Sequence, residues 1–157
     1  MKKCVECGSR TLLHTVEVVP FNDVANVDAN VYTCQSCGER YQGFSRVEEL
    51  TREVAHNIAR RAERLQPLEI RFLRKYLGYS GKDFAGFLGV APETISRWEN
   101  SEHPMQMQLS TEKLIRMMAM SEKPVSEYGL DIAATRSLKR TGKIRLRESK
   151  GKWTVAA

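Results

Sequence analysis

Residues 68–100 read LEIRFLRKYLGYSGKDFAGFLGVAPETISRWEN, and this stretch decides the predicted architecture. Ser80 stands where it caps a helix over 81–88, because a serine side chain accepts from the free N–H groups of a first helical turn. The turn that follows begins at Gly89, and Pro92 takes the first position of the next helix, where its missing N–H costs nothing. A helix, a tight glycine-containing turn and a second helix are the ingredients of a helix-turn-helix.

The flanking sequence extends this pair into four or five short helices between residues 68 and 121. The first is expected over 68–77, and the last ends near Ser121, ahead of Pro124. The methionines of the last helix leave two alternatives, a helical core or a surface that binds a partner. The core candidates at helical spacing are Ile70, Leu73, Leu77, Phe84, Ala85, Leu88, Ile95, Trp98, Leu109, Leu114, Ile115, Met117 and Met118.

A longer helix is predicted upstream of this bundle. It opens at Ser45, with Glu48 three residues later completing a capping box, and Pro67 ends it. The apolar pattern covers fewer than three heptads, which favours an amphipathic connector over a coiled coil. The residues that form this pattern are Val47, Leu50, Val54, Ile58 and Leu65.

The four cysteines form two pairs, Cys4-Val-Glu-Cys7 and Cys34-Gln-Ser-Cys37, and a glycine follows each pair. Two residues between thiolates allow both sulfurs to turn onto one metal ion, and the glycine permits the tight backbone of that turn. Four soft sulfur ligands are typical of structural zinc. The pattern therefore predicts one Zn²⁺ per chain, bound by all four cysteines. Free thiols are the alternative, and the pattern around a redox Cys-x-x-Cys is absent.

The 26 residues between the two pairs must carry structure of their own. Residues 11–21 are rich in β-branched side chains and residues 29–33 form a second short run, which predicts a small antiparallel ribbon. About 43 residues bury too little apolar surface to fold alone, so the metal would act as a staple. The predicted fold is mainly α with a small β zinc ribbon.

The charge distribution and the lack of long apolar runs indicate which classes of protein this chain can belong to. The 157 residues carry a formal charge of +6, and residues 136–157 hold the whole excess, with eight basic residues against Glu148. No Lys or Arg occurs from Thr11 to Glu39, so the predicted ribbon is acidic. The chain shows no apolar run of membrane length and no secretory signal, which indicates a cytoplasmic protein with polyanions as plausible partners.

Three segments, 73–80, 84–90 and 95–100, resemble the Xre/Cro-type helix-turn-helix. Together with the upstream cysteine pairs, which resemble the YgiT-type zinc finger, they are similar to the MqsA family of antitoxins. The resemblance covers about residues 1–121. It implies a homodimeric repressor that reads a palindrome in double-stranded DNA, autoregulates its operon and masks a basic ribonuclease toxin with its zinc domain.

The same resemblance implies roles for single residues. It places base contacts at Glu93 and Arg97, and Thr94 is added because it is expected on the same helix face. An arginine can form two hydrogen bonds to guanine. Glu93 has an alternative role as an acid that stabilises a helix N-terminus. The phosphate contacts are expected at Ser80, Lys82 and Asn100.

A structural ion pair between Arg74 and Glu99 is also implied by the resemblance. Two departures weaken the expected phosphate contacts, because Gly81 stands where the family often has Gln and Ala91 where it often has Ser or Thr.

The basic tail lies outside the resemblance. Ile144 and Leu146 alternate with arginines, and Trp153 and Val155 alternate after a turn, which predicts a short hairpin. We expect this arm to touch DNA phosphates beside the reading helix. A disordered basic tail is the alternative. The predicted organisation is a zinc ribbon over 1–43, a linker helix over 44–66, a helix-turn-helix domain over 67–122 and the tail over 123–157.

No nucleophile triad, phosphate loop or open metal site stands out, and the three histidines lie at no ligand spacing, so no enzyme is expected. Two function classes remain. One is a repressor that neutralises a toxin through its zinc domain. The other is a stand-alone transcriptional regulator whose zinc ribbon is structural or binds another protein. A thiol–zinc redox sensor is a weaker third class.

Overall fold

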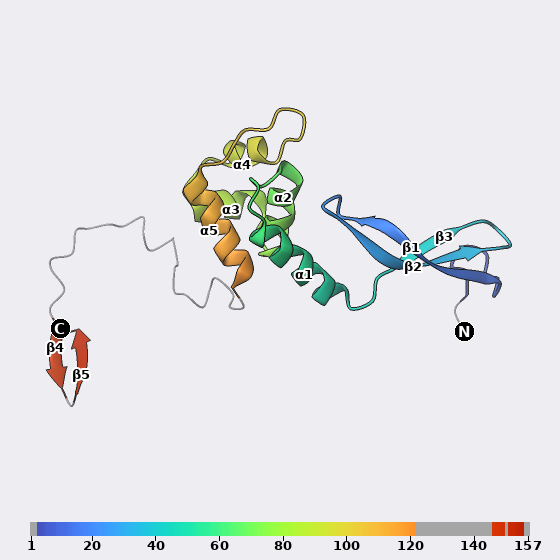
Figure 1. Ribbon diagram of the computed structural model, residues 1–157, viewed down its shortest axis with the longest axis horizontal. Coiled ribbons are helices and arrows are strands. Elements are labelled where there is room, and N and C mark those ends of the chain that lie inside the picture. The colour runs from blue at the N-terminus through green and yellow to red at the C-terminus, as the bar shows by residue number, and fades with distance from the viewer. Residues whose placement is uncertain (1–2, 122–145, 150, 156–157) are drawn as a thin grey trace. The chain divides into compact units, whose positions relative to one another are not determined.

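The computed structural model of the protein describes residues 3–121, 146–149 and 151–155 (Figure 1). The chain divides into two compact units, Met1–Pro124 and Val125–Ala157. The elements in chain order are β1 (Leu12–Phe21), β2 (Ala25–Cys34), β3 (Arg40–Gly43), α1 (Val47–Arg60), α2 (Pro67–Tyr76), α3 (Gly81–Leu88), α4 (Pro92–Trp98), α5 (Leu109–Met120), β4 (Leu146–Ser149) and β5 (Lys152–Val155).

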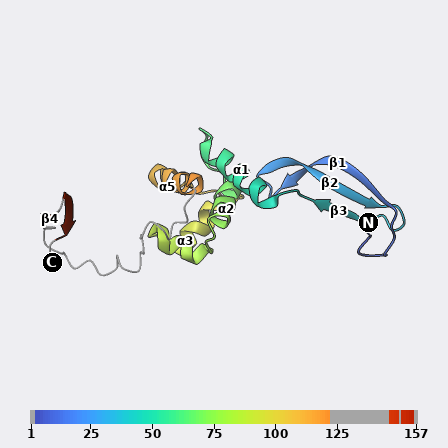
Figure 2. The same cartoon turned by 90° about the horizontal axis from the view of Figure 1, so that it is seen from below.

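The expectation of a mainly α protein with a small β zinc ribbon is wrong, because the described chain is a small α/β fold. β1 and β2 run for ten residues each and pair along their whole length, and β3 adds a third antiparallel strand (Figure 2). The physical reason is a tight turn at Asn22 and Asp23, both with left-handed backbone at φ 50° and 58°. This turn lets residues 25–28, which sequence analysis left outside any strand, pair back onto β1.

The sequence predicts that Pro20 ends the first strand, but Pro20 lies inside β1, opposite Asn26. Proline has no N–H to give to a ladder and is therefore confined to edge strands. The strand order β1-β2-β3 places β1 at an edge, which accommodates this residue.

The start of α1 differs from the prediction. The helix begins at Val47 after a left-handed Arg46, whose side chain makes no cap, and the capping box expected from Ser45 and Glu48 does not form. The helix ends at Arg60 and is therefore shorter than predicted.

Pro67 does not end the upstream helix but occupies the first turn of α2. A reciprocal capping box between Gln66 and Glu69 starts this helix, with the Glu69 carboxylate accepting from the Gln66 N–H at 2.9 Å. The box satisfies N–H groups that a first helical turn leaves free.

One apolar core joins the tip of the β1–β2 hairpin to the five helices. Phe21 at the end of β1 is buried and makes edge-to-face contacts with Phe44 at 5.2 Å and Phe72 of α2 at 6.4 Å between ring centroids. Burying a phenylalanine contributes roughly 1.5–3 kcal/mol. The sheet itself holds only a small separate cluster, formed by Val19, Ala29 and Val31.

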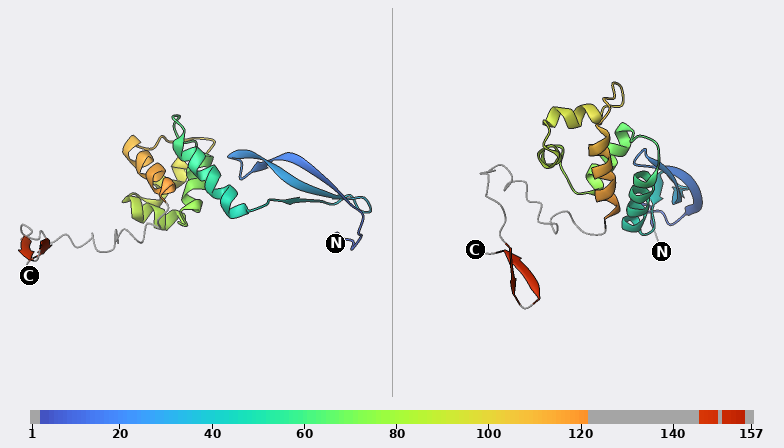
Figure 3. Two further views of the ribbon diagram at one scale, coloured as in Figure 1. Left: turned by 60° about the horizontal axis from the view of Figure 1, so that its bottom comes forward. Right: turned by 60° about the vertical axis from the view of Figure 1, so that its left-hand side comes forward.

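A buried carboxylate ties α5 to the segment after α1. Glu112 accepts from Arg116 at 2.8 Å and from Arg64 at 2.5 Å, and the Leu65 backbone N–H donates to it at 3.1 Å. Arg116 also donates to carbonyl oxygens at the end of α1, including Ala59 at 3.1 Å. These contacts hold α5 alongside α1, as both views of Figure 3 show.

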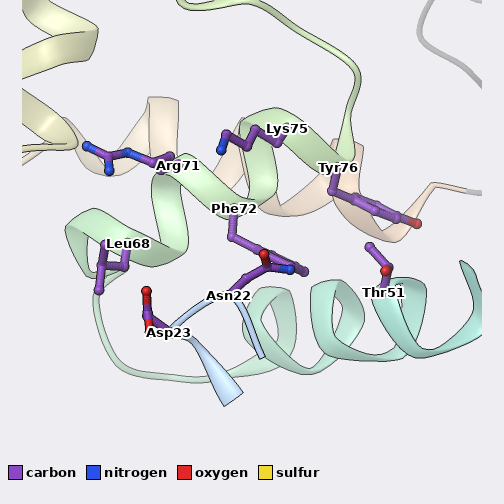
Figure 4. Close-up of a pocket in the computed structure, with 8 residues that line it drawn as sticks. All are labelled: Asn22, Asp23, Thr51, Leu68, Arg71, Phe72, Lys75 and Tyr76. Carbon is purple, nitrogen blue, oxygen red and sulfur yellow. The ribbon is translucent and has the colours of Figure 1, made fainter. Parts of the chain in front are cut away.

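A shallow pocket of about 310 Å³ lies where the hairpin tip meets α1 and α2 (Figure 4). The Asn22 side chain lies beside the Phe72 ring, and Thr51 of α1 faces α2. The complete lining is Asn22, Asp23, Thr51, Leu68, Arg71, Phe72, Lys75 and Tyr76.

In the second unit the structure describes β4 and β5, which pair antiparallel across a left-handed Gly151 at φ 74°. The predicted hairpin falls on these strands. Most of the basic residues assigned to the tail, from Arg136 to Arg145, lie outside the described residues. The predicted domain boundaries remain predictions.

Candidate metal centre and nucleic-acid interface

The sulfur atoms of Cys4, Cys7, Cys34 and Cys37 all lie within 4.8 Å of one another and could hold a metal ion. Cys4 and Cys37 approach to 3.6 Å, and so do Cys7 and Cys34. Zinc–sulfur bonds of about 2.3 Å make the edges of a tetrahedron about 3.8 Å long, which the two 3.6 Å approaches match. The prediction that the two cysteine pairs converge is confirmed.

Two matched turns produce this convergence. The Gly8 N–H donates to the Cys4 carbonyl at 3.0 Å, and the Gly38 N–H donates to the Cys34 carbonyl at 2.9 Å. Both glycines have left-handed backbone, at φ 71° and 77°. Residues with a Cβ atom rarely adopt this conformation, which explains the glycine at each position. The pairing of Leu12 with Cys34 in the β1–β2 ladder then brings the first turn beside the second.

Sequence analysis missed one residue of this centre, Tyr41 of β3. Its Oη lies 2.8 Å from Cys4 Sγ and accepts from the Val5 N–H at 3.1 Å. The Glu6 N–H also donates to this oxygen at 3.4 Å, so two amides occupy its acceptor positions and the phenol proton is left to donate to the sulfur. This hydrogen bond lowers the pKa of the Cys4 thiol to about 6 and raises the pKa of Tyr41 to about 12. No sequence signal marks the residue, since strand pairing alone brings it to Cys4.

The second candidate site is the outer face of α4. Ile95 and Trp98 are buried in the core, whereas Glu93 and Arg97, four residues apart, are exposed side by side. Thr94 is half-buried between these two faces. Within the described part of the chain, no ion pair or side-chain hydrogen bond holds the Arg97 guanidinium.

The turn before α4 follows the predicted chemistry. Gly89 ends α3 with left-handed backbone at φ 68°, and its N–H donates to the α3 carbonyls. Pro92 then begins α4 from an uncapped Ala91. A turn of three residues, 89–91, therefore joins α3 to α4.

The three residues expected to contact phosphates differ in their surroundings. The Ser80 hydroxyl donates to Asp83 Oδ2 at 2.6 Å and accepts from the Asp83 N–H at 3.1 Å. Both its proton and its lone pair are thus engaged, and the carboxylate beside it repels anions. Lys82 is exposed at the start of α3. Asn100 accepts two backbone N–H groups through Oδ1, the nearer at 2.8 Å from Glu102, which leaves its amide N–H groups to donate elsewhere.

Arg74 of α2 and Glu99, directly after α4, form a two-pronged ion pair with N–O distances of 2.6 and 2.9 Å. The exposed fractions of the two side chains are 12% and 8%. Sequence analysis missed a third member, Arg71, which donates to the Glu99 carboxylate at 3.3 Å and to its carbonyl at 3.1 Å. Two cations therefore fix the end of α4 against α2.

The chain matches no family model, no curated protein and no solved structure. Among the described residues, no helix combines the length and the apolar character needed to cross a bilayer.

Proposed function

We propose that this protein is a sequence-specific DNA-binding transcriptional repressor that reads DNA with α4. The observation that supports this is Arg97, which is exposed on the outer face of α4 and has no carboxylate partner among the described residues. Five other arginines around this bundle (Arg61, Arg64, Arg71, Arg74 and Arg116) are paired with carboxylates. A cation that the protein leaves unpaired on a short, rigidly held helix suits recognition of guanine in the major groove.

The proposal includes a homodimer. α5 exposes one apolar face in which Met117 is 71% exposed, although Ile115 and Met118 of the same helix are buried. An apolar helix face of this kind fits a second copy of the chain, and a two-fold dimer would place two copies of α4 on a palindrome. The exposed residues of this face are Leu109, Leu114, Met117 and Met120.

The four-cysteine centre is assigned to a structural Zn²⁺. The close sulfur spacing and the all-thiolate ligand set fit this ion. The bound ion would cross-link the start of β1 to the β2–β3 turn. The sheet needs such a link because its own core has only three buried side chains among the described residues, with Val27 and Phe44 packed against them.

The sheet is further proposed to bind a basic ribonuclease toxin, so that the protein is an antitoxin as well as a repressor. Support comes from the lack of any Lys or Arg between Thr11 and Glu39, together with the family resemblance. A stand-alone regulator with no toxin partner is the second candidate. Calorimetry of the full chain with the product of the neighbouring gene separates the two, because only an antitoxin should form a complex.

The DNA-binding proposal is tested by selecting duplexes from a random pool with the full-length protein. Arg97→Ala should reduce the preference for the selected duplex over a scrambled one by roughly 5- to 150-fold, equivalent to about 1–3 kcal/mol. Arg60→Ala removes the same charge from the end of α1 and serves as the control. No enrichment by the wild-type chain would reject the proposal, and equal weakening on both duplexes would make Arg97 a phosphate contact.

A further inference from the structure

β1 is an unprotected sheet edge. The strand order leaves one side of β1 without a neighbour among the described residues, so alternate backbone N–H and C=O groups have no strand to pair with. Natural edge strands are usually short, cationic or bulged. The opposite edge, β3, has four residues and carries Arg40, whereas β1 has ten residues, a continuous register and no Lys or Arg.

Two apolar side chains along this edge, Val16 and Val18, are exposed to solvent. Val16 and Val18 are 65% and 69% exposed, and as residues two apart on a strand they share one face. Their partners across the ladder in β2 are Asn30 and Asp28, respectively. Pro20 protects the edge only near the hairpin turn. Single exposed valines are common on protein surfaces. Two exposed valines next to unpaired backbone N–H and C=O groups, however, provide a surface to which another strand can bind.

The charge around the edge indicates which strand would fit. Asp28 lies across the ladder from Val18, and of the four carboxylates in the segment Thr11–Glu39 the described residues pair only Glu17 with a cation, Arg40 of β3. A second copy of β1 would bring two such acidic sheets together, which like charges disfavour. A strand with basic side chains would instead complement this face.

We infer that the free edge of β1 binds a β-strand of a protein partner, in which valine-like and basic side chains alternate. The inference rests on the proposed role of the sheet in binding a basic protein, and it specifies how that partner is held. Backbone hydrogen bonds to β1 would supply affinity. On the face of Val16 and Val18 the partner's basic side chains would lie with their methylene stems over the valines and their charge toward Asp28, and its valine-like side chains would lie on the opposite face.

The test uses the full-length, metal-loaded protein labelled with ¹⁵N and a synthetic ten-residue peptide of alternating Lys and Val. We expect the amide shifts caused by the peptide to concentrate in residues 12–19. The same peptide with Glu in place of Lys should bind roughly tenfold more weakly, because cross-strand charge pairs contribute up to about 1 kcal/mol each. A peptide with every amide N-methylated should not bind, since it has no N–H to donate along either edge.

Two variants locate the site. Val16→Lys places a cation on the edge and should abolish peptide binding. Val47→Lys adds the same charge at a residue of α1 that is 49% exposed and outside the sheet, and should bind like the wild type. Both substituted side chains lie at the surface, so both spectra should retain the wild-type dispersion.

Shifts confined to β3 or the helices, unchanged binding by Val16→Lys, or equal binding of the N-methylated peptide would overturn the inference. Shifts of β1 amides that depend on protein concentration without peptide would assign the edge to a second copy instead. Peptide binding at β1 without a complex with the neighbouring gene's product would retain the edge site and reject the toxin. A complex that Val16→Lys leaves intact would retain the partner and reject the edge site.

Discussion

Glu99→Gln should destabilise the protein more than any surface ion-pair substitution. The change keeps the shape of the side chain but removes the charge that faces Arg74 at 2.6 and 2.9 Å. Because the Arg74 side chain is only 12% exposed, its guanidinium would lose its counter-charge without gaining water. Breaking a buried pair in this way costs about 3–5 kcal/mol, a large part of the roughly 5–15 kcal/mol that stabilises a domain.

The expected shift in melting temperature follows from the size of the first unit, Met1–Pro124. A loss of 1 kcal/mol lowers the Tm of a domain of this size by about 4 °C, so we expect a decrease of about 12–20 °C. Circular dichroism at 222 nm during heating measures this, and urea unfolding gives the free energy. A second variant, Arg74→Met combined with Glu99→Gln, should recover part of the loss because it also removes the unpaired cation.

Glu17→Gln is the matched control. Glu17 pairs with Arg40 at 2.7 Å, but these side chains are 40% and 58% exposed. An exposed pair contributes under about 1 kcal/mol, so the Tm should fall by only a few degrees. If Glu99→Gln lowers the Tm no more than this control, the buried-pair argument is refuted.

Three further outcomes are expected. Tyr41→Phe removes the hydrogen bond to Cys4 Sγ and should speed metal transfer to a chromogenic chelator by about 10-fold or more, with unchanged circular dichroism; an unchanged rate would make this hydrogen bond irrelevant to the metal. Burial raises the pKa of Glu112, but hydrogen bonds from Arg116, Leu65 and Arg64 outweigh it and lower that pKa. Its stabilisation is therefore present above the unfolded-state pKa of about 4.3 and lost as pH falls through the folded pKa, so melting temperature should fall more steeply below pH 4 in the wild type than in Glu112→Gln. A chain ending at Arg136 should bind its selected duplex with a salt dependence shallower by about 0.9 for each phosphate that the tail neutralises, and an equal slope would exclude the tail from DNA.

The sequence alone determined the turns and helix ends of this protein, because their geometry depends on residues only a few positions apart in the chain. Each Cys-x-x-Cys-Gly segment forms its turn from its own residues. The left-handed backbone of Gly8 and Gly38 is part of these turns. The cap at Ser80, the left-handed Gly89 and Pro92 in the first turn of α4 are likewise decided within a few residues. The sequence also predicted an inward Ile95 and Trp98, because helical periodicity separates the buried face of α4 from its outer face.

The tertiary structure decided what depends on residues far apart in the chain. Strand pairing decided the length of β2 and the existence of β3, and hence the α/β fold class. The stability of a strand depends more on its packing against the neighbouring strand than on its own β propensity. Met117 and Met118 are adjacent residues of one helix, yet one is exposed and the other buried, because only the packing of α5 decides which face is covered. Tyr41 reaches Cys4, and Phe21 enters the helical core, only after the hairpin has formed. Such contacts join residues tens of positions apart, so no local pattern encodes them.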